Sequence, residues 1–256
     1  MEKSEVEEFY DNLSNSYRNT HSNRFVDEIF EHLLHEYLPK GKLILLDAGA
    51  GIGRFSIPLA YRCKKLVLTE ISEGMLNEAR KNVALINNQN NIEFYHESAT
   101  NMKNQASNSF DVVLLMNSVL DYCDDYIKSL HEVHRVLKKG GLVIGTVNNR
   151  LIYTTTNILL EQKSIKSFLK AFATGDYCKW FLVHDFTYEE LKNALEKTHF
   201  KTTEIFGPTN LLRKWEYESL SKNVNRQALL RMQLKFAKRK EYLNNSSDFF
   251  FVAKKI

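Results

Sequence analysis

Residues 43–53 read LILLDAGAGIG, and this stretch decides the fold. Its first four residues, Leu43–Leu46, form an apolar run typical of a fully buried strand. The acid Asp47 follows, and glycines at 49, 51 and 53 let the chain turn sharply and approach a ligand with its backbone. The spacing is G-x-G-x-G, whereas dinucleotide-binding loops read G-x-G-x-x-G. An acid two residues before the first glycine suits a cationic amino group rather than a diphosphate. A tight turn without a ligand is the alternative.

Apolar runs and helical patterns alternate on both sides of this loop. The patterns predict strands at 43–47, 65–69, 92–95, 110–116 and 142–147, and helices at 55–60, 72–85 and 127–137. Ser72 is the expected N-cap of the second helix, and Gly140 and Gly141 are the expected stop of the third. Such alternation indicates right-handed βαβ units, a doubly wound parallel sheet, and a ligand beyond the carboxyl ends of its strands.

The second half of the chain is less regular. Residues 148–183 contain many aromatic side chains and no clear strand pattern. A helix is predicted at 187–197, where Thr187 and Glu190 form a capping box. Strands are predicted at 200–206 and 248–253 around a mostly helical stretch at 211–242, which would give the sheet an antiparallel edge.

Composition places the chain among globular proteins of the cytoplasm. Of its 256 residues, 43% are hydrophobic and 26% charged, which excludes a disordered chain. The apolar runs are of strand length, so no membrane segment is expected, and the acidic first residues lack the apolar core of a signal peptide. The three cysteines are few and far apart, so neither a disulfide framework nor a zinc or other metal site is predicted.

A second acid, Glu70, ends the second predicted strand, where a carboxylate can accept hydrogen bonds from both hydroxyls of a ribose. An ordinary surface acid is the alternative. Three further marks are Glu-Ser-Ala at 97–99, Ser-Phe-Asp-Val-Val at 109–113, and Arg-Val-Leu-Lys-Lys-Gly-Gly at 135–141. With both acids and these marks, residues 43–148 resemble the class I (Rossmann-like) S-adenosylmethionine-dependent methyltransferases of the small-molecule type.

The resemblance implies a set of contacts to S-adenosylmethionine, which leaves as S-adenosylhomocysteine. The methionine part is expected at Asp47, Gly49 and Gly51, the ribose at Glu70, the adenine at Ile71, Met75, Ser98 and Ala99, and the methyl group near Met116 and Asn117. Ser98 departs from the pattern, because many relatives carry Asp there, and a hydroxyl accepts more weakly than a carboxylate.

The N-terminal residues 9–17 are similar to the helical lid of small-molecule members. Tyr10 and Tyr17 would close over the cofactor, and Arg24 would meet its carboxylate; an amphipathic helix packed on the domain edge is the alternative. We therefore expect one methyltransferase domain over residues 1–256, an α/β fold with a doubly wound, mostly parallel seven-stranded sheet. Its parts are lid helices at 1–40, a cofactor-binding core at 41–148, a helical cap insertion at 149–186, and the C-terminal part of the sheet at 187–256.

Catalytic residues are harder to predict, since the cofactor brings the reactivity and a base is needed only for some acceptors. His184 with Asp185 as its orienting partner is one candidate, and Asp121 with Tyr122 is another. Aromatic residues of the cap could wall a pocket for an apolar or cationic substrate, or form the core of the cap. The set is Tyr153, Phe168, Phe172, Tyr177, Trp180, Phe181, His184 and Phe186.

The predicted function is transfer of a methyl group to an N or O atom of a small molecule or modified peptide. A basic stretch at 226–240 motivates the alternative of an RNA methyltransferase, although Met116-Asn117-Ser118-Val119 lacks the motif of base-amino methylases and no cysteine follows a proline. A second alternative is a non-catalytic cofactor-binding protein, motivated by Ser98. The acceptor and the oligomeric state are not predicted by the sequence.

Overall fold

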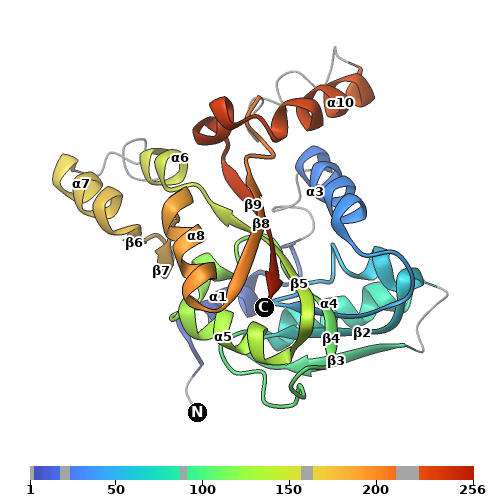
Figure 1. Ribbon diagram of the computed structural model, residues 1–256. Coiled ribbons are helices and arrows are strands. Elements are labelled where there is room, and N and C mark those ends of the chain that lie inside the picture. The colour runs from blue at the N-terminus through green and yellow to red at the C-terminus, as the bar shows by residue number, and fades with distance from the viewer. Residues whose placement is uncertain (1–2, 18–23, 87–90, 157–163, 212–224) are drawn as a thin grey trace.

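The computed structural model describes residues 3–17, 24–86, 91–156, 164–211 and 225–256 (Figure 1). A seven-stranded sheet with the strand order β3-β2-β1-β4-β5-β9-β8 forms its centre. The strands are β1 Leu43–Ala48, β2 Cys63–Glu70, β3 Ile92–His96, β4 Phe110–Leu115, β5 Leu137–Asn148, β8 Phe200–Phe206 and β9 Asp248–Lys255. The first five are parallel, and β9 runs antiparallel to both β5 and β8. The predicted α/β fold with an antiparallel edge is confirmed.

Helices cover both faces of the sheet. Helices α3 (Arg24–Tyr37), α4 (Glu73–Val83) and α10 (Arg226–Ala237) share one hydrophobic cluster with the sheet, and α5 (Tyr126–Val136) and α8 (Tyr188–Lys197) share the other. Successive residues of β1, such as Leu45 and Leu46, point to opposite faces of the sheet, enter different clusters and are fully buried. The apolar run that predicted this strand is therefore explained by burial of both its faces.

Two local predictions in the core are wrong. The expected helix at 55–60 is a 3₁₀ helix, η1 (Ile57–Arg62), preceded by turns, because Gly53 at φ +74° interrupts α geometry directly before it. The expected glycine stop of α5 lies inside β5, while the helix already ends at Val136. Phe110 pairs with Leu137 and Val112 with Leu142, so these glycines form a bulge in which Gly140 has φ +77°.

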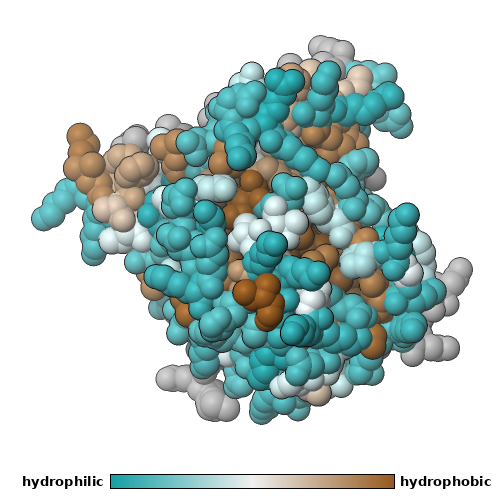
Figure 2. Space-filling model, in the orientation of Figure 1, coloured by the Kyte–Doolittle hydropathy of each residue, from teal (hydrophilic) through white to brown (hydrophobic). Residues whose placement is uncertain are grey.

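The cap contains a hairpin that the sequence did not predict. Helices α6 (Arg150–Thr154) and α7 (Ile165–Thr174) precede strands β6 (Asp176–Cys178) and β7 (Leu182–His184), which pair antiparallel. Strands of three residues are too short to show a two-residue period. Figure 2 shows hydrophobic residues gathered over α7, the part of the cap that extends from the body.

The helices outside the core follow the prediction in part. The Thr187 hydroxyl accepts from the amide of Glu190 at the start of α8, but the Glu190 side chain turns to Arg150 and His184 instead of completing the capping box. The expected lid forms helix α1 (Glu5–Leu13). Of the stretch 211–242, residues 212–224 lie outside the described part, and α10 and the 3₁₀ helix η4 (Lys240–Asn245) follow. Within the described residues, no helix is long and apolar enough to cross a membrane.

Candidate functional site

A pocket of about 960 Å³, partly open to solvent, lies beyond the carboxyl ends of β1, β2 and β4. Of the thirteen residues predicted to hold a ligand, twelve line it: Tyr10, Tyr17, Asp47, Gly49, Gly51, Glu70, Ile71, Met75, Ser98, Ala99, Met116 and Asn117. The side chain of the thirteenth, Arg24, lies outside the described residues. The structure thus brings together residues that are spread over more than a hundred positions of the chain.

The glycine loop forms the floor of the pocket. Gly49, Gly51 and Gly53 all have positive φ, at +74°, +54° and +74°, a region that other residues rarely adopt. The amide of Gly49 donates to the carbonyl of Thr69 at 2.8 Å, which ties the loop to the end of β2. A Cβ on Gly49 would lie 2.7 Å from a Val119 methyl group, so only glycine fits here.

Glu70 is held by the backbone around it. Its two carboxylate oxygens accept from the amides of Gly51 at 2.8 Å, Ile71 at 2.9 Å and Ser72 at 3.0 Å. Burial raises the pKa of Glu70, although these hydrogen bonds oppose the shift. A carboxylate has about four lone-pair positions, so one remains for a donor in the pocket.

Asp47 and Arg54 place opposite charges on the same wall. Asp47 is 2% exposed, and burial raises the pKa of its carboxyl to about 7. Arg54 also lines the pocket and pairs with Asp27 of α3 at 3.2 Å. Arg54 is not among the residues predicted from the sequence, although its position directly after the last glycine of the loop could have indicated it. Together the two side chains suit a ligand group that carries both an ammonium and a carboxylate.

The end of β4 adopts an unusual backbone. Asn117 and Ser118 both have positive φ, at +62° and +69°, which is costly outside glycine. The conformation is held by hydrogen bonds from the Asn117 amide to the Thr146 hydroxyl at 2.8 Å and from Ser118 Oγ to Asn148 Oδ1 at 2.9 Å. Asn117 Nδ2 donates to the Tyr17 hydroxyl at 3.1 Å, so this strained turn also contacts the lid.

Tyr10, Tyr122 and Phe181 join the lid to the cap above the pocket. The Tyr10 and Tyr122 ring centroids lie 6.3 Å apart, and Tyr122 meets Phe181 edge to face at 5.3 Å. Tyr10 comes from α1, Tyr122 from the 3₁₀ helix η2 (Leu120–Tyr122), and Phe181 from the β6–β7 hairpin. Burial raises the pKa of both tyrosines well above 10, so these phenols stay protonated and are poor bases.

The expected catalytic pair of His184 and Asp185 is wrong in its geometry. The His184 ring nitrogens contact Asp176 at 2.6 Å and Glu190 at 3.1 Å, and neither contacts Asp185. Asp185 is fully buried and instead accepts from Asn148 Nδ2 at 2.9 Å. None of the seven aromatic residues and His184 named above belongs to the described lining of the pocket. Phe168, Tyr177 and Phe181 pack in the core of the cap, and Phe186 packs in the cluster that α5 and α8 share with the sheet.

Of the second candidate pair, Asp121 and Tyr122, the structure places only one residue in the pocket. Tyr122 lines the pocket, whereas Asp121 lies behind it, 1% exposed, and accepts from the amide of Asn148 at 2.7 Å. Burial raises the pKa of Asp121 well above its usual value, and the nearby Asp185 adds to the shift. Cys123 and Asp124, which follow in sequence, do line the pocket and were missed.

At the far end of the pocket, Ser98 hydrogen bonds with the Thr100 hydroxyl at 2.9 Å and accepts from the Thr100 amide at 3.2 Å. The preceding Glu97 is 5% exposed and accepts from the Asn104 amide at 2.7 Å and from Gln105 at 2.9 Å, so it fixes the loop after β3. A carboxylate is thus present at position 97 in place of 98, but its two oxygens already accept hydrogen bonds from Asn104 and Gln105.

Known proteins with similar sequences include methyltransferases. A family model described as a methyltransferase domain matches residues 46–145. Two curated relatives are demethylmenaquinone methyltransferase of Bacteroides fragilis, 29% identical over 68% of this chain and 81% of that protein, and ubiquinone biosynthesis O-methyltransferase of Ruegeria pomeroyi, 28% identical over 77% of this chain and 76% of that protein.

A solved structure shares the fold over nearly the whole chain. It is an S-adenosylmethionine-dependent methyltransferase of Thermotoga maritima, described as a possible histamine N-methyltransferase. The match covers 98% of this chain and 100% of that one, with a TM-score of 0.62 and 19% identity. At this identity the likeness shows the fold, which includes the lid and cap regions, and not the substrate.

Proposed function

The chain belongs to the class I S-adenosylmethionine-dependent methyltransferases, and from this premise we propose that it methylates an N or O atom of a small molecule. The observation that carries the proposal is the pocket itself. It places two buried acids, Asp47 and Glu70, at the ends of neighbouring strands, with the glycine loop between them. This supports the proposal, because it is the arrangement that the resemblance to these methyltransferases implies for the cofactor.

Each part of the cofactor has a matching group in the pocket. Asp47 would pair with the ammonium of the methionine part, and Arg54 would hold its carboxylate. Glu70 would accept from one ribose hydroxyl with its remaining lone-pair position. Ile71 and Met75 would pack against the adenine, with Ser98 at its edge.

The bound cofactor supplies a methyl group activated on a sulfonium. What the chain must provide is position and exclusion of water, because the transfer is an in-line displacement that needs an aligned nucleophile. Tyr10, Tyr17 and Tyr122 line the pocket on the side of the lid, and their phenols keep their protons. Asp124 is the exposed carboxylate of the lining and would take a proton from an acceptor that needs to lose one.

Calorimetry with S-adenosylmethionine tests the first half of the proposal. We expect micromolar binding to the wild-type chain and a loss of at least tenfold in D47A and in E70A, since each removes a charged partner. E8A is the matched control, because Glu8 is an exposed acid of the lid that lines no part of the pocket. Binding that is unchanged in both site variants would contradict the assignment.

Turnover tests the second half. Purified protein with labelled cofactor is incubated with pools of small amines, phenols and quinol precursors, and methyl incorporation and S-adenosylhomocysteine are measured together. Methylation of a member of these pools supports the proposal. Cofactor binding without turnover on any pool would favour the non-catalytic alternative.

The RNA alternative has lost part of its motivation. Two basic residues of this stretch face acids of α3. Arg226, at the start of α10, forms two hydrogen bonds with Glu28, at 2.8 and 2.9 Å, and Lys238, directly after α10, pairs with Glu36. These cations therefore serve the packing of two helices, and the charge of this stretch is partly neutralised within the chain.

A further inference from the structure

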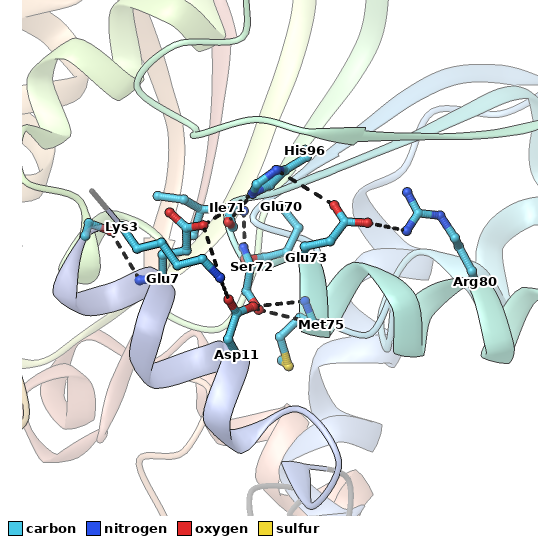
Figure 3. Close-up of polar contacts among 12 residues, drawn as sticks. Lys3, Glu7, Asp11, Glu70, Ile71, Ser72, Glu73, Met75, Arg80 and His96 are labelled. Carbon is cyan, nitrogen blue, oxygen red and sulfur yellow. Dashed lines mark hydrogen bonds and ion pairs between the residues drawn. The ribbon is translucent and has the colours of Figure 1, made fainter. Parts of the chain in front are cut away.

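The carboxylate of Asp11 ties the lid helix to α4 beside the cofactor pocket. Asp11 projects from α1 onto the first turn of α4, where its Oδ1 accepts from Ser72 Oγ at 2.5 Å and from the Gly74 amide at 2.9 Å (Figure 3). Lys3, on the residues before the helix, pairs with the same carboxylate. Burial opposes the charge, but these three partners outweigh it and hold the pKa of Asp11 below its usual value.

Ser72 continues the contact into the pocket. Its hydroxyl donates to Asp11 and also caps α4 by accepting from the Met75 amide at 3.1 Å, while its own amide donates to Glu70 at 3.0 Å. Glu70 in turn accepts from the amide of Gly51 at 2.8 Å. A continuous chain of hydrogen bonds therefore runs from the lid through the acid at the end of β2 to the glycine loop, as Figure 3 shows for its first members.

Gly74 is small because the lid lies against it. Its φ is not positive, so its backbone does not require glycine. A Cβ at this position would lie 2.9 Å from Ser14 Oγ and 3.1 Å from Asp11 Oδ1, both of which belong to the lid segment. The missing side chain thus allows the close approach that the hydrogen bonds of Asp11 need.

We infer that Asp11 is a positioning residue that keeps the lid docked on α4 and thereby holds Tyr10 in the wall of the cofactor pocket. The neighbouring position on the helix directs Tyr10 to the pocket, where its ring lies 6.2 Å from that of Tyr17. Loss of the Asp11 contacts would free the lid and open the pocket without removing any group that touches the cofactor. The effect on the cofactor rests on the proposed function, whereas the docking of the lid does not.

The first experiment measures S-adenosylhomocysteine binding to D11A, D11N and the control E8Q. D11A should raise the dissociation rate about tenfold at unchanged stoichiometry, because a charge-assisted contact that closes the pocket is lost. D11N should recover part of the affinity, since an amide oxygen still accepts from Ser72 and Gly74. E8Q should bind like the wild type. A damaged fold would instead lower the stoichiometry, and a dissociation rate within twofold of the wild type in D11A would overturn the inference.

The second experiment needs no ligand, so it separates a failure of this inference from a failure of the proposed function. Hydrogen exchange of the amides of 5–13 is followed in the wild type, D11A and G74A. Both variants should exchange faster across α1, although alanine within a helix is otherwise favourable. Unchanged exchange in both variants would show that Asp11 does not hold the lid, whatever the cofactor does.

Discussion

Cofactor binding should weaken about tenfold when the pH falls from 8 to 6, because Asp47 must be ionised to pair with the ammonium of the methionine part. The carboxyl is 2% exposed, and burial raises its pKa to about 7. In the empty pocket at neutral pH, it is therefore about half protonated. A cation beside it favours the charged form, so binding should expel the proton.

The magnitude follows from the ionised fraction of Asp47. With a pKa of about 7, that fraction is about 0.9 at pH 8, about 0.5 at pH 7 and about 0.1 at pH 6. If only the ionised form binds, the apparent affinity falls by about tenfold over this range, which corresponds to about 1.4 kcal/mol. Proton release on binding should rise correspondingly, from about 0.1 at pH 8 to about 0.9 at pH 6.

Calorimetry in buffers of different ionisation enthalpy measures both quantities. D47N should bind more weakly at pH 8 and lose the pH dependence, because an amide does not titrate. H96Q is the matched control, because it removes an imidazole beside the pocket, where His96 contacts the Ile71 carbonyl at 2.6 Å. An affinity that is constant from pH 6 to 8 in the wild type, or a pH dependence that persists in D47N, would refute the reasoning.

Three further predictions concern charged residues. D47N should raise the free energy of unfolding of the ligand-free protein above pH 7, by at most about 4 kcal/mol. The reason is that a carboxyl with a raised pKa destabilises the folded state increasingly as the pH rises from the unfolded to the folded pKa. Urea unfolding at pH 8 measures this difference. R54A should weaken cofactor binding about tenfold or more, with R54K intermediate, as measured by calorimetry. H184Q should leave cofactor binding unchanged but lower the free energy of unfolding at pH 6 by about 1 kcal/mol. Burial opposes the charge of His184, but Glu190 and Asp176 raise its pKa. The stability that the charged ring contributes is therefore full below pH 6.5 and is lost as the pH rises through the folded pKa.

The core of the fold could be predicted because strands that are buried on both faces consist mainly of apolar residues. Central parallel strands are covered on both faces, which turns them into apolar runs such as 110–115. The two acids at their ends are also visible, because a charged residue that directly follows a buried apolar run stands out from it. Asp47 and Glu70 were found in this way, and the pocket contains both.

Features that leave no periodic pattern, or that depend on contacts distant in sequence, were not predictable. The β6–β7 hairpin has strands of three residues, and the bulge at Gly140 becomes visible only when β4 is aligned with β5. Asn117 and Ser118 take a backbone conformation that neither residue type demands, and hydrogen bonds from β5 hold it. Adjacency in the sequence also misled, because His184 and Asp185 point to different partners.

The acceptor end of the pocket differs from the cofactor end in how it is built, which explains why the acceptor is harder to infer. Its described lining comes from the lid, with Tyr10, and from the residues after β4, with Tyr122 and Asp124, and the cap packs behind them. The two phenols keep their protons, so of these three side chains the solvent-exposed carboxylate of Asp124 is the one that can act as a base. A nucleophile that must lose a proton would have to reach Asp124, whereas a neutral amine or an already ionised phenol would need no base. For an acceptor of the second kind, we expect the pH dependence of turnover to report the ionisation of the acceptor itself.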